Sequence, residues 1–336
     1  MTLSSKSDNT SPLKLAVCGS GRWGRALMIN IVALPNLELA AVISARTSLP
    51  PTLTLGAPVF DDWQTAAENV DLDGILLALP PARQPTVAEQ IIKSGIPLFL
   101  EKPLALKDEA ANRLARIAED QGFIGLVDHL HLFAPEFRKL VRVARSRGEI
   151  RGITSVSGNR GPHRDSWSAC WDWAPHDVSM ALTVMDSVPT SVVAQIVDRA
   201  EDGGIVFENI RLIMTFSNGT VADITTGNAF DSRRREFSVA LEDFTILYSE
   251  SSESERALVM GHGSNMRPVQ VDSVPPLTSS LMEFASRVRQ GKGGDTDLAL
   301  GVNVVRILSA AELSISKGLS VAIDQSVPGS TNGNVG

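Results

Sequence analysis

Three glycines at the spacing Gly-x-Gly-x-x-Gly constrain the fold of this chain more than any other feature. They are Gly19, Gly21 and Gly24 in the stretch VCGSGRWGRAL, which follows a short apolar run and opens a segment with helical apolar spacing. In a strand-turn-helix unit, such glycines permit a tight turn, close approach of a phosphate, and packing of the helix on the strand. The pattern predicts a dinucleotide-binding turn that includes Arg22 and Trp23. The alternative is a glycine turn with a purely structural role.

The first part of the chain alternates runs of strand length with helical patterns. LELAAVIS, DGILLALP and IPLFLEKP are mostly apolar, as parallel strands buried on both faces are. We therefore expect a doubly wound α/β domain with a parallel sheet over residues 1–127.

The second part has a different pattern. From about Arg151, runs such as SVVAQIVD and EFSVALEDFTILYS alternate apolar and polar residues, as in an antiparallel sheet with one face in water. We expect an α+β domain over 128–325, closed by helices at 277–289 and 296–317. The polar, glycine-rich residues 326–336 are expected to be a disordered tail.

Composition and charge exclude several classes of partner. A chain of 336 residues with 43% hydrophobic residues is large enough for two domains. Its net charge of -7 argues against nucleic acid and membrane partners, which select clustered Lys and Arg, and favours a small molecule. Cys18 and Cys170 lie far apart and support neither a disulfide framework nor a thiolate zinc site. With no apolar signal segment and no run of about 18 consecutive apolar residues, we expect a cytoplasmic protein.

The end of the second predicted strand bears on the choice between NAD and NADP. AAVISART places Ser44 where an NAD-specific protein usually carries Asp or Glu. A serine does not repel a 2'-phosphate, while Arg46 and Thr47 offer a guanidinium group and a hydroxyl to hold one. NADP is the favoured cofactor and NAD the alternative. If Arg46 is only an exposed loop residue, the choice stays open.

Three stretches together resemble the Gfo/Idh/MocA oxidoreductases, the glucose-fructose oxidoreductase and inositol dehydrogenase family. They are GSGRWG, LPPARQPTVAEQIIKSGIPLFLEKPLA and VDHLHLFAPEFRKLVRVARSRGEIRGI, and WDWAPHDVSMAL is similar to a branch associated with nucleotide-sugar and polysaccharide pathways. The resemblance implies an N-terminal Rossmann domain and a C-terminal α+β domain with a large open sheet. It also implies a homodimer or homotetramer formed through that sheet.

The resemblance gives a role to the charged end of the run PLFLEKPLAL. In open parallel sheets ligands bind beyond the carboxyl ends of the strands, where Glu101 and Lys102 stand. The resemblance implies that Lys102 lies beside the nicotinamide and that its bond to Pro103 is often cis. It also places Pro80, Pro81 and Gln84 in the nicotinamide loop, with Gln84 where many relatives have His. The alternative is a solvated lysine that ends a strand.

A second candidate constellation is WDWAPHDVSM. Asp172 and His176 are four residues apart and share a face if the segment is helical, although Pro175 suggests that the regular helix starts there. The resemblance makes His176 the proton donor or acceptor and has Asp172 orient the substrate or tune the site. A histidine suits this role because its pKa of about 6.5 allows both protonation states near neutrality. The alternative is a helix-start histidine satisfied by a backbone carbonyl.

Weaker candidates surround this motif. His129 and His131 share a face if they lie in a strand, so a metal site with His163 or His176 is conceivable, but no acidic or cysteine partner stands at a ligand spacing and no metal is expected. The predicted substrate-binding residues, each with an ordinary surface or core role as the alternative, are His129, Arg160, His163, Asp165 and Trp171.

These residues predict an NAD(P)-dependent oxidoreductase that interconverts a hydroxyl and a carbonyl on a sugar, nucleotide-sugar or polyol. Two other classes stay open. One is a cofactor-binding regulator on the same fold, against which the presence of both Lys102 and His176 argues. The other is a glycoside hydrolase that uses a bound nicotinamide transiently.

Overall fold

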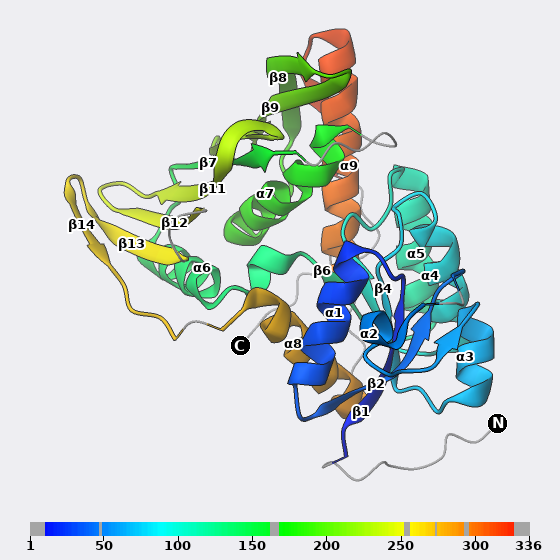
Figure 1. Cartoon of the computed structure of the whole chain (residues 1–336). Coiled ribbons are helices and arrows are strands. Elements are labelled where there is room, and N and C mark those ends of the chain that lie inside the picture. Colours follow the sequence, from blue (N-terminus) through cyan, green and yellow to red (C-terminus); the bar gives the residue numbers. More distant parts are fainter. Residues whose placement is uncertain are drawn as a thin grey trace. The chain divides into compact units, whose positions relative to one another are not determined.

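A computed structural model describes residues 11–46, 49–161, 168–251, 256–272, 274–291 and 296–325 (Figure 1). The chain divides into two compact units. Unit 1 takes in the chain up to Ala105, together with Glu109–Asp128 and Leu277–Ala299. Unit 2 consists of Leu106–Asp108, His129–Pro276 and the chain from Leu300 onward. The tail predicted at 326–336 lies outside the described residues.

Unit 1 is built on a six-stranded parallel sheet with the order β3-β2-β1-β4-β5-β6, which confirms the predicted doubly wound fold. Strands β4, β5 and β6 are buried along their whole length, as strands covered on both faces are. The strands are β1 (Leu13–Cys18), β2 (Leu37–Ile43), β3 (Val59–Phe60), β4 (Gly74–Leu77), β5 (Leu98–Glu101) and β6 (Gly125–Asp128).

The helices of unit 1 include one that lies far along the chain. They are α1 (Arg22–Ala33), α2 (Pro51–Thr54), α3 (Trp63–Asn69), α4 (Gln84–Ser94), α5 (Asp108–Asp120) and α8 (Pro276–Gln290). We expected α8 to close the second domain, but it packs on the parallel sheet. The Phe284 ring meets that of Phe99 edge to face at 5.8 Å, and Arg287 donates to the Gly125 carbonyl at 3.1 Å.

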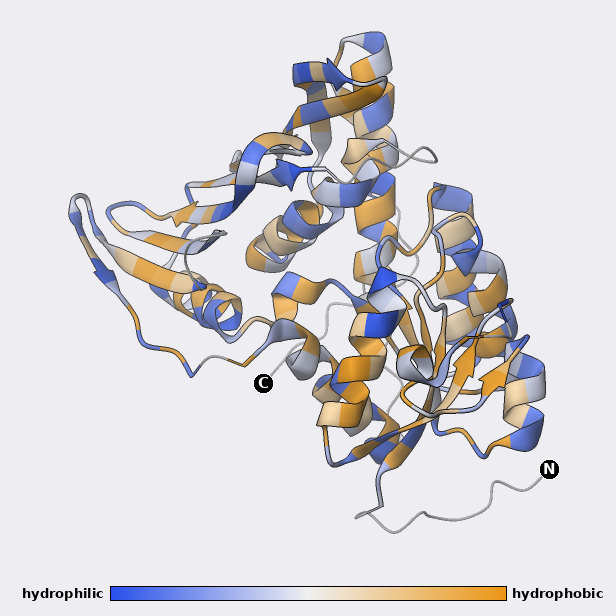
Figure 2. Ribbon diagram, in the orientation of Figure 1, coloured by the Kyte–Doolittle hydropathy of each residue, from blue (hydrophilic) through white to orange (hydrophobic). Residues whose placement is uncertain are grey.

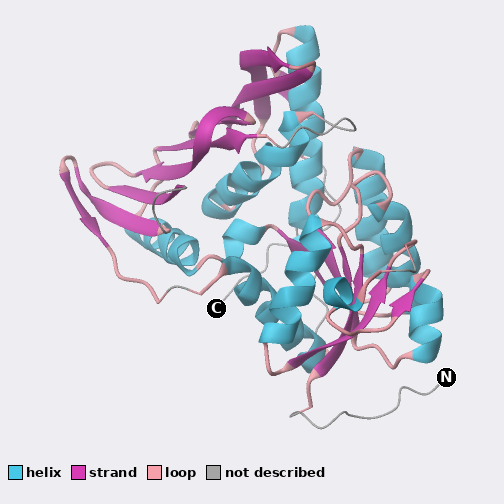
Figure 3. Ribbon diagram, viewed as in Figure 1, coloured by secondary structure: helices cyan, strands magenta, loops and turns pink. Residues whose placement is uncertain are grey.

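Unit 2 contains a nine-stranded sheet with the order β14-β13-β12-β11-β7-β10-β9-β8-β15. Its strands pair antiparallel except for β7 and β10, which run parallel, so the predicted open, mostly antiparallel sheet is confirmed (Figure 3). The strands are β7 (Gly152–Arg160), β8 (Ser191–Asp202), β9 (Ile205–Thr215), β10 (Val221–Gly227), β11 (Ala229–Ala240), β12 (Thr245–Ser251), β13 (Ala257–His262), β14 (Asn265–Pro268) and β15 (Val321–Ala322).

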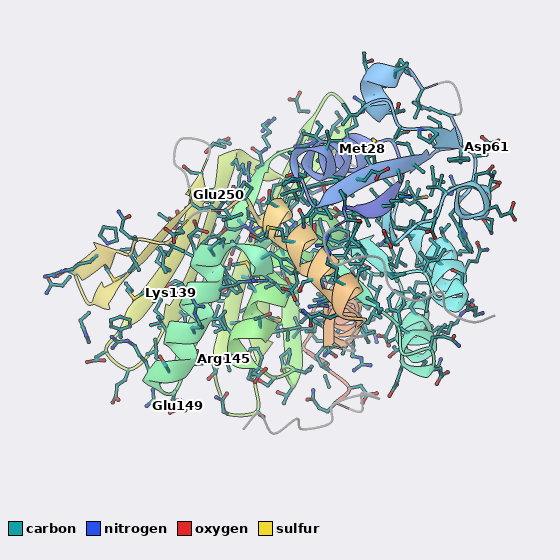
Figure 4. All side chains as sticks on the ribbon, turned by 90° about the horizontal axis from the view of Figure 1, so that it is seen from below. Met28, Asp61, Lys139, Arg145, Glu149 and Glu250 are labelled. Carbon is teal, nitrogen blue, oxygen red and sulfur yellow. The ribbon has the colours of Figure 1, made fainter. Side chains whose placement is uncertain are left out.

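Helices α6 (Pro135–Arg147) and α7 (Ala169–Met185) pack against this sheet, and the short 3-10 helix η1 (Leu130–Phe133) precedes them. On α6, Phe137 and Leu140 are buried, whereas Lys139 is half-buried and Arg145 is exposed (Figure 4). The sheet itself retains exposed apolar side chains on β8 and β9, where orange and blue alternate in Figure 2. These residues are Val193, Ile196, Val197 and Ile205.

Helix α9 (Thr296–Lys317) has the bounds that the sequence predicted. Its residues Leu298–Lys317 have a mean hydropathy of 1.6, and by length and composition alone they would suffice to cross a membrane. Half of that stretch is buried in the protein, and the Ser314 hydroxyl accepts a hydrogen bond from the Ala194 amide on β8 at 2.9 Å. We therefore interpret α9 as a core helix.

Candidate active site

The glycine turn between β1 and α1 has the geometry that the motif predicts. Gly19 has φ of +116°, a left-handed backbone conformation that favours glycine. A Cβ there would also lie 2.3 Å from the Ala78 carbonyl oxygen, so a larger residue does not fit. A Cβ on Gly24 would lie 1.8 Å from the Gly19 carbonyl oxygen. These two glycines therefore let the helix, the turn and the neighbouring strand end pack together.

Gly21 differs from its neighbours because a Cβ there would meet nothing within 4 Å. It is the N-cap of α1, no side chain caps the helix, and the first turn carries no acidic residue. The first N-H groups of a helix lack intrahelical acceptors and attract anions. Arg22 is exposed and Trp23 half-buried at this end. The turn thus leaves open the approach that a pyrophosphate needs, and these residues fit a dinucleotide.

Ser20 and Ser44 meet at the end of β2. Their hydroxyl oxygens lie 3.1 Å apart, and the Arg46 backbone amide donates to the Ser44 hydroxyl at 3.2 Å. Ser44 is buried while Arg46 is exposed. The strand end therefore presents hydroxyls and a guanidinium group, with no carboxylate at residue 44. Thr47, the third predicted phosphate contact, lies outside the described residues.

Gln84 holds the backbone on both sides of Lys102. Its side-chain amide donates to the carbonyl oxygens of Glu101 at 2.5 Å and Pro103 at 3.1 Å, and the side chain is 1% exposed. The Lys102-Pro103 bond is cis, as the family resemblance implied. Gln84 was predicted as a cofactor contact, but its amide nitrogen is engaged by the backbone. Of the two prolines placed in the same loop, Pro80 is exposed and Pro81 is buried.

Two carboxyl groups end neighbouring strands beside Lys102. Glu101 on β5 is the register partner of Asp128 on β6, and both side chains are buried. Burial raises the pKa of Glu101 to about 7, while the charge of Lys102 opposes this shift. Burial and the neighbouring charge of Glu101 raise the pKa of Asp128 well above its ordinary value. Glu101 was predicted from the sequence as a cofactor contact, whereas Asp128 was not predicted.

In unit 2, helix α7 carries Asp172 and His176. It begins at Ala169 and continues through Pro175, so the proline does not start the helix. The two side chains are therefore one helical turn apart on one face, both half-buried.

His131 lies against His176, although the sequence had placed the two together only in a conceivable metal site and had given His131 no other role. The two rings meet edge to face at 5.0 Å, and His131 Nδ1 lies 3.4 Å from the Tyr248 hydroxyl. We expected His129 and His131 to alternate on a strand, but β6 ends at Asp128 and the chain turns into η1. Neither histidine joins a metal-binding group of three or more side chains among the described residues. The edge-to-face contact of His131 with His176 follows from this break in the strand.

The remaining predicted substrate residues have different surroundings. Trp171 is buried on α7, which favours a packing role. Arg160, at the end of β7, is exposed, lies 3.3 Å from Asp202 and stacks over the Phe207 ring at 4.7 Å. His163 and Asp165 lie outside the described residues. His129 is buried.

The parallel sheet, its glycine turn and the lysine at a strand end define a dinucleotide-binding oxidoreductase fold. Residues 13–129 match the family described as "Oxidoreductase family, NAD-binding Rossmann fold", and residues 137–247 match the "GFO/IDH/MocA C-terminal domain". The chain belongs to the Gfo/Idh/MocA family of NAD(P)-dependent oxidoreductases.

Relatives include solved and curated proteins. A solved protein from Magnetospirillum magnetotacticum MS-1, provisionally described as an oxidoreductase, is 32% identical with a TM-score of 0.78, over 89% of this chain and 99% of that one. A dTDP-3,4-didehydro-2,6-dideoxy-alpha-D-glucose 3-reductase from Actinomadura kijaniata is 25% identical over 44% of this chain and 46% of the reductase, so the match spans about half the length of that relative. An inositol 2-dehydrogenase from Rhizobium meliloti is 23% identical over 77% of this chain and 78% of that protein.

Proposed function

We propose that this protein interconverts a hydroxyl and a carbonyl on a sugar, nucleotide sugar or polyol, with NADP as the favoured cofactor and NAD as the alternative. The observation that carries the proposal is the common edge of the parallel sheet. There the open Gly21 turn and Lys102 both stand at the carboxyl ends of strands, where such sheets bind ligands. The relatives named for an inositol and a dTDP-sugar support this class of substrate.

A nicotinamide, when bound, would supply the hydride chemistry of the proposed reaction, and residues of this chain would handle the substrate oxygen and its proton. Lys102 donates a hydrogen bond to the oxygen of the reacting carbon and stabilises the negative charge that develops there. His176 takes the proton of that oxygen in the direction of oxidation and returns it in the direction of reduction. Asp172, on the same face of α7, orients the substrate or tunes His176. Arg160, His163 and Asp165 remain proposed substrate contacts.

At the adenine end, Ser44 and Arg46 support the preference for NADP. The Ser44 hydroxyl accepts from the Arg46 amide, which fixes the start of the loop that carries the guanidinium group. A guanidinium group binds phosphate oxygens through charged hydrogen bonds. We further propose, from the sequence, a cytoplasmic homodimer or homotetramer formed through the sheet of unit 2, whose exposed apolar residues on β8 and β9 support a subunit contact.

A substrate screen tests the proposal. The purified protein is incubated with NADP or NAD and a panel of polyols, sugars and nucleotide sugars, and formation of the reduced nicotinamide is followed by absorbance. Stoichiometric accumulation of reduced cofactor with an oxidised sugar supports a dehydrogenase. Hydrolysis of a glycoside without net cofactor change would support the transient use of nicotinamide instead. Tight nucleotide binding with no turnover on any substrate would favour a regulator.

A further inference from the structure

The paired ends of β5 and β6 bring two acidic side chains together. Glu101 and Asp128 are directly opposite in the parallel register, in which neighbouring strands lie about 4.8 Å apart. Register partners point to the same face of a sheet. The two carboxyl groups are therefore neighbours, although they are far apart in the sequence.

Both carboxyl groups lie in the interior of unit 1. Glu101 is 7% exposed and Asp128 is 1% exposed. Glu101 Oε1 and Asp128 Oδ1 are shielded from solvent and find no hydrogen-bond partner among the described residues. Two adjacent carboxylates in such a position would each lose hydration and repel one another. The environment therefore disfavours the state in which both are ionised.

The groups around the pair come from several elements. Lys102 follows Glu101 on β5, and its charge acts on both carboxyl groups. From α8, the Ser280 hydroxyl donates to the Leu277 carbonyl at 3.1 Å and lowers the pKa of Asp128 against the larger effect of burial. From α4, the Gln84 amide faces the backbone at Glu101. On α4 and α5, Glu89 forms ion pairs with Lys93 and Arg113.

We propose that Glu101 and Asp128 share one proton at neutral pH and act together as a single negative counter-charge for Lys102. The inference rests on the proposed function in that it gives Lys102 a chemical role. One shared proton leaves the pair with one negative charge, which balances one ammonium group. Glu101 and Asp128 are thus positioning residues, which act on the substrate only through Lys102.

The raised pKa values of both carboxyl groups agree with this arrangement. Burial raises the pKa of Glu101 to about 7, and burial and the charge of Glu101 raise that of Asp128. When two such groups interact strongly, the protons leave in two steps that belong to the pair. Near neutral pH the pair is then between its first and second deprotonation.

Infrared spectroscopy of the protein without nucleotide or substrate tests the shared proton directly. The carboxylic-acid C=O band is compared between wild type and Glu101→Gln/Asp128→Asn, first at neutral pH and then at about pH 5, where the pair takes up both protons. We expect the difference band at neutral pH to have about half of its area at the lower pH. A difference band that is absent at neutral pH, or that already has its full area there, overturns the proposal.

If the double variant does not fold, the infrared test is made with the two single variants. Each single variant removes the repulsion between the two carboxyl groups and leaves one carboxyl group, whose pKa burial still raises. Asp128→Asn and Glu101→Gln should therefore each give a smaller band than wild type at neutral pH. Persistence of the wild-type band in both single variants overturns the proposal. Glu119→Gln, an exposed position on α5, serves as the control and should keep the band.

The pH profile of kcat/KM tests the counter-charge. Wild type and each single variant retain at least one negative charge beside Lys102 at alkaline pH, so the alkaline limb of each should lie at higher pH than that of the double variant. The double variant retains none, and its alkaline limb should move to lower pH by about one unit or more. An unmoved limb in an active double variant overturns the counter-charge role. The infrared test needs no turnover, so failure of the proposed reaction is distinguishable from failure of the shared proton.

Discussion

Arg235 Nη1 donates to Asp177 Oδ1 at 2.5 Å inside unit 2, where the two side chains are 5% and 0% exposed. The same carboxylate accepts hydrogen bonds from Ser155 and Ser157 on β7, at 2.8 Å and 2.6 Å. Asp177 directly follows His176 on α7. The network therefore fixes the helix that presents the candidate proton-transfer residue against the sheet.

Removing one partner of this ion pair should strongly destabilise the protein. Arg235→Met leaves the Asp177 carboxylate buried without its cation, and breaking a buried pair in this way costs about 3 to 5 kcal/mol. Urea denaturation measures the free energy of unfolding. The control is Arg211→Met, which breaks the partly exposed pair between Arg211 and Asp223, 41% and 33% exposed, and should cost about 1 kcal/mol or less. Equal losses of unfolding free energy in the two variants would show that the buried pair stabilises the protein no more than the partly exposed pair does.

Gln84 should affect turnover through the backbone at Lys102. Gln84→Glu has nearly the same shape, but an ionised carboxylate cannot donate to the carbonyls of Glu101 and Pro103. We expect about a 10-fold or larger fall in kcat, since each lost buried hydrogen bond is worth about 1 to 3 kcal/mol. The measurement is steady-state kinetics beside a nucleotide titration. Gln90→Glu, exposed on the same helix, should behave as wild type, and an unchanged kcat in Gln84→Glu would show that the contact does not position Lys102.

Several elements could be predicted from sequence because local patterns determine them. The glycine spacing predicted the turn at Gly19, the apolar runs predicted the parallel strands, and the bounds of α9 agree with the helical pattern. The position of Lys102 at the end of a strand followed from the abrupt change from apolar to charged residues. In each case the information lies within one short segment.

Other features depend on tertiary packing. The amphipathic pattern of α8 shows that one face is buried, but not that Phe284 meets Phe99 on the parallel sheet. The pairing of Glu101 with Asp128 requires the strand order and register, which no local pattern contains. The packing of His131 on His176 was not predicted because the alternation in VDHLHLF suggested a strand, whereas backbone torsions of -76° and 72° at His129 lead into a 3-10 helix.

Substitutions at Ser44 and Arg46, the residues proposed to lie at the adenine end of the cofactor, should change cofactor preference. If Arg46 holds a 2'-phosphate, wild type should bind NADPH more tightly than NADH, and Arg46→Ala should lose about 1.5 to 3 kcal/mol of affinity for NADPH alone. Ser44→Asp should shift preference toward NADH by repelling the phosphate. Fluorescence titration with both nucleotides measures this, with the exposed Arg25→Ala on α1 as a control. If wild type binds NADPH and NADH equally and Arg46→Ala changes neither affinity, Ser44 and Arg46 do not determine the choice of cofactor.

Lys102 and His176 should affect catalysis far more than nucleotide binding. Lys102→Met and His176→Ala are each expected to lower turnover by about 100- to 10,000-fold, the range for lost acid-base catalysis. Nucleotide affinity should fall much less, because the glycine turn and the adenine-end residues remain. Steady-state kinetics and nucleotide titration separate the two effects, and Lys93→Met on the exposed side of α4 is the control. Near-normal turnover in both variants would contradict the catalytic roles.

The buried carboxyl pair also makes stability depend on pH. The pKa of Glu101 is raised from 4.5 to about 7, so the folded chain binds more protons than the unfolded chain within this window. The contribution to stability is fully present below about pH 4.5 and is lost as pH rises through about 7, and the raised pKa of Asp128 acts in the same direction.

Urea denaturation at a series of pH values between about 5 and 8 measures this slope. In wild type and in Glu119→Gln, the Glu101 and Asp128 contribution should lower the free energy of unfolding as pH rises. In Glu101→Gln/Asp128→Asn that contribution is absent, because neither replacement titrates, so the curve should fall less steeply. The difference between the two curves isolates the pair from the other titrating groups, which both proteins share. Parallel curves for wild type and the double variant would mean that the two carboxyl groups titrate alike in the folded and unfolded chains.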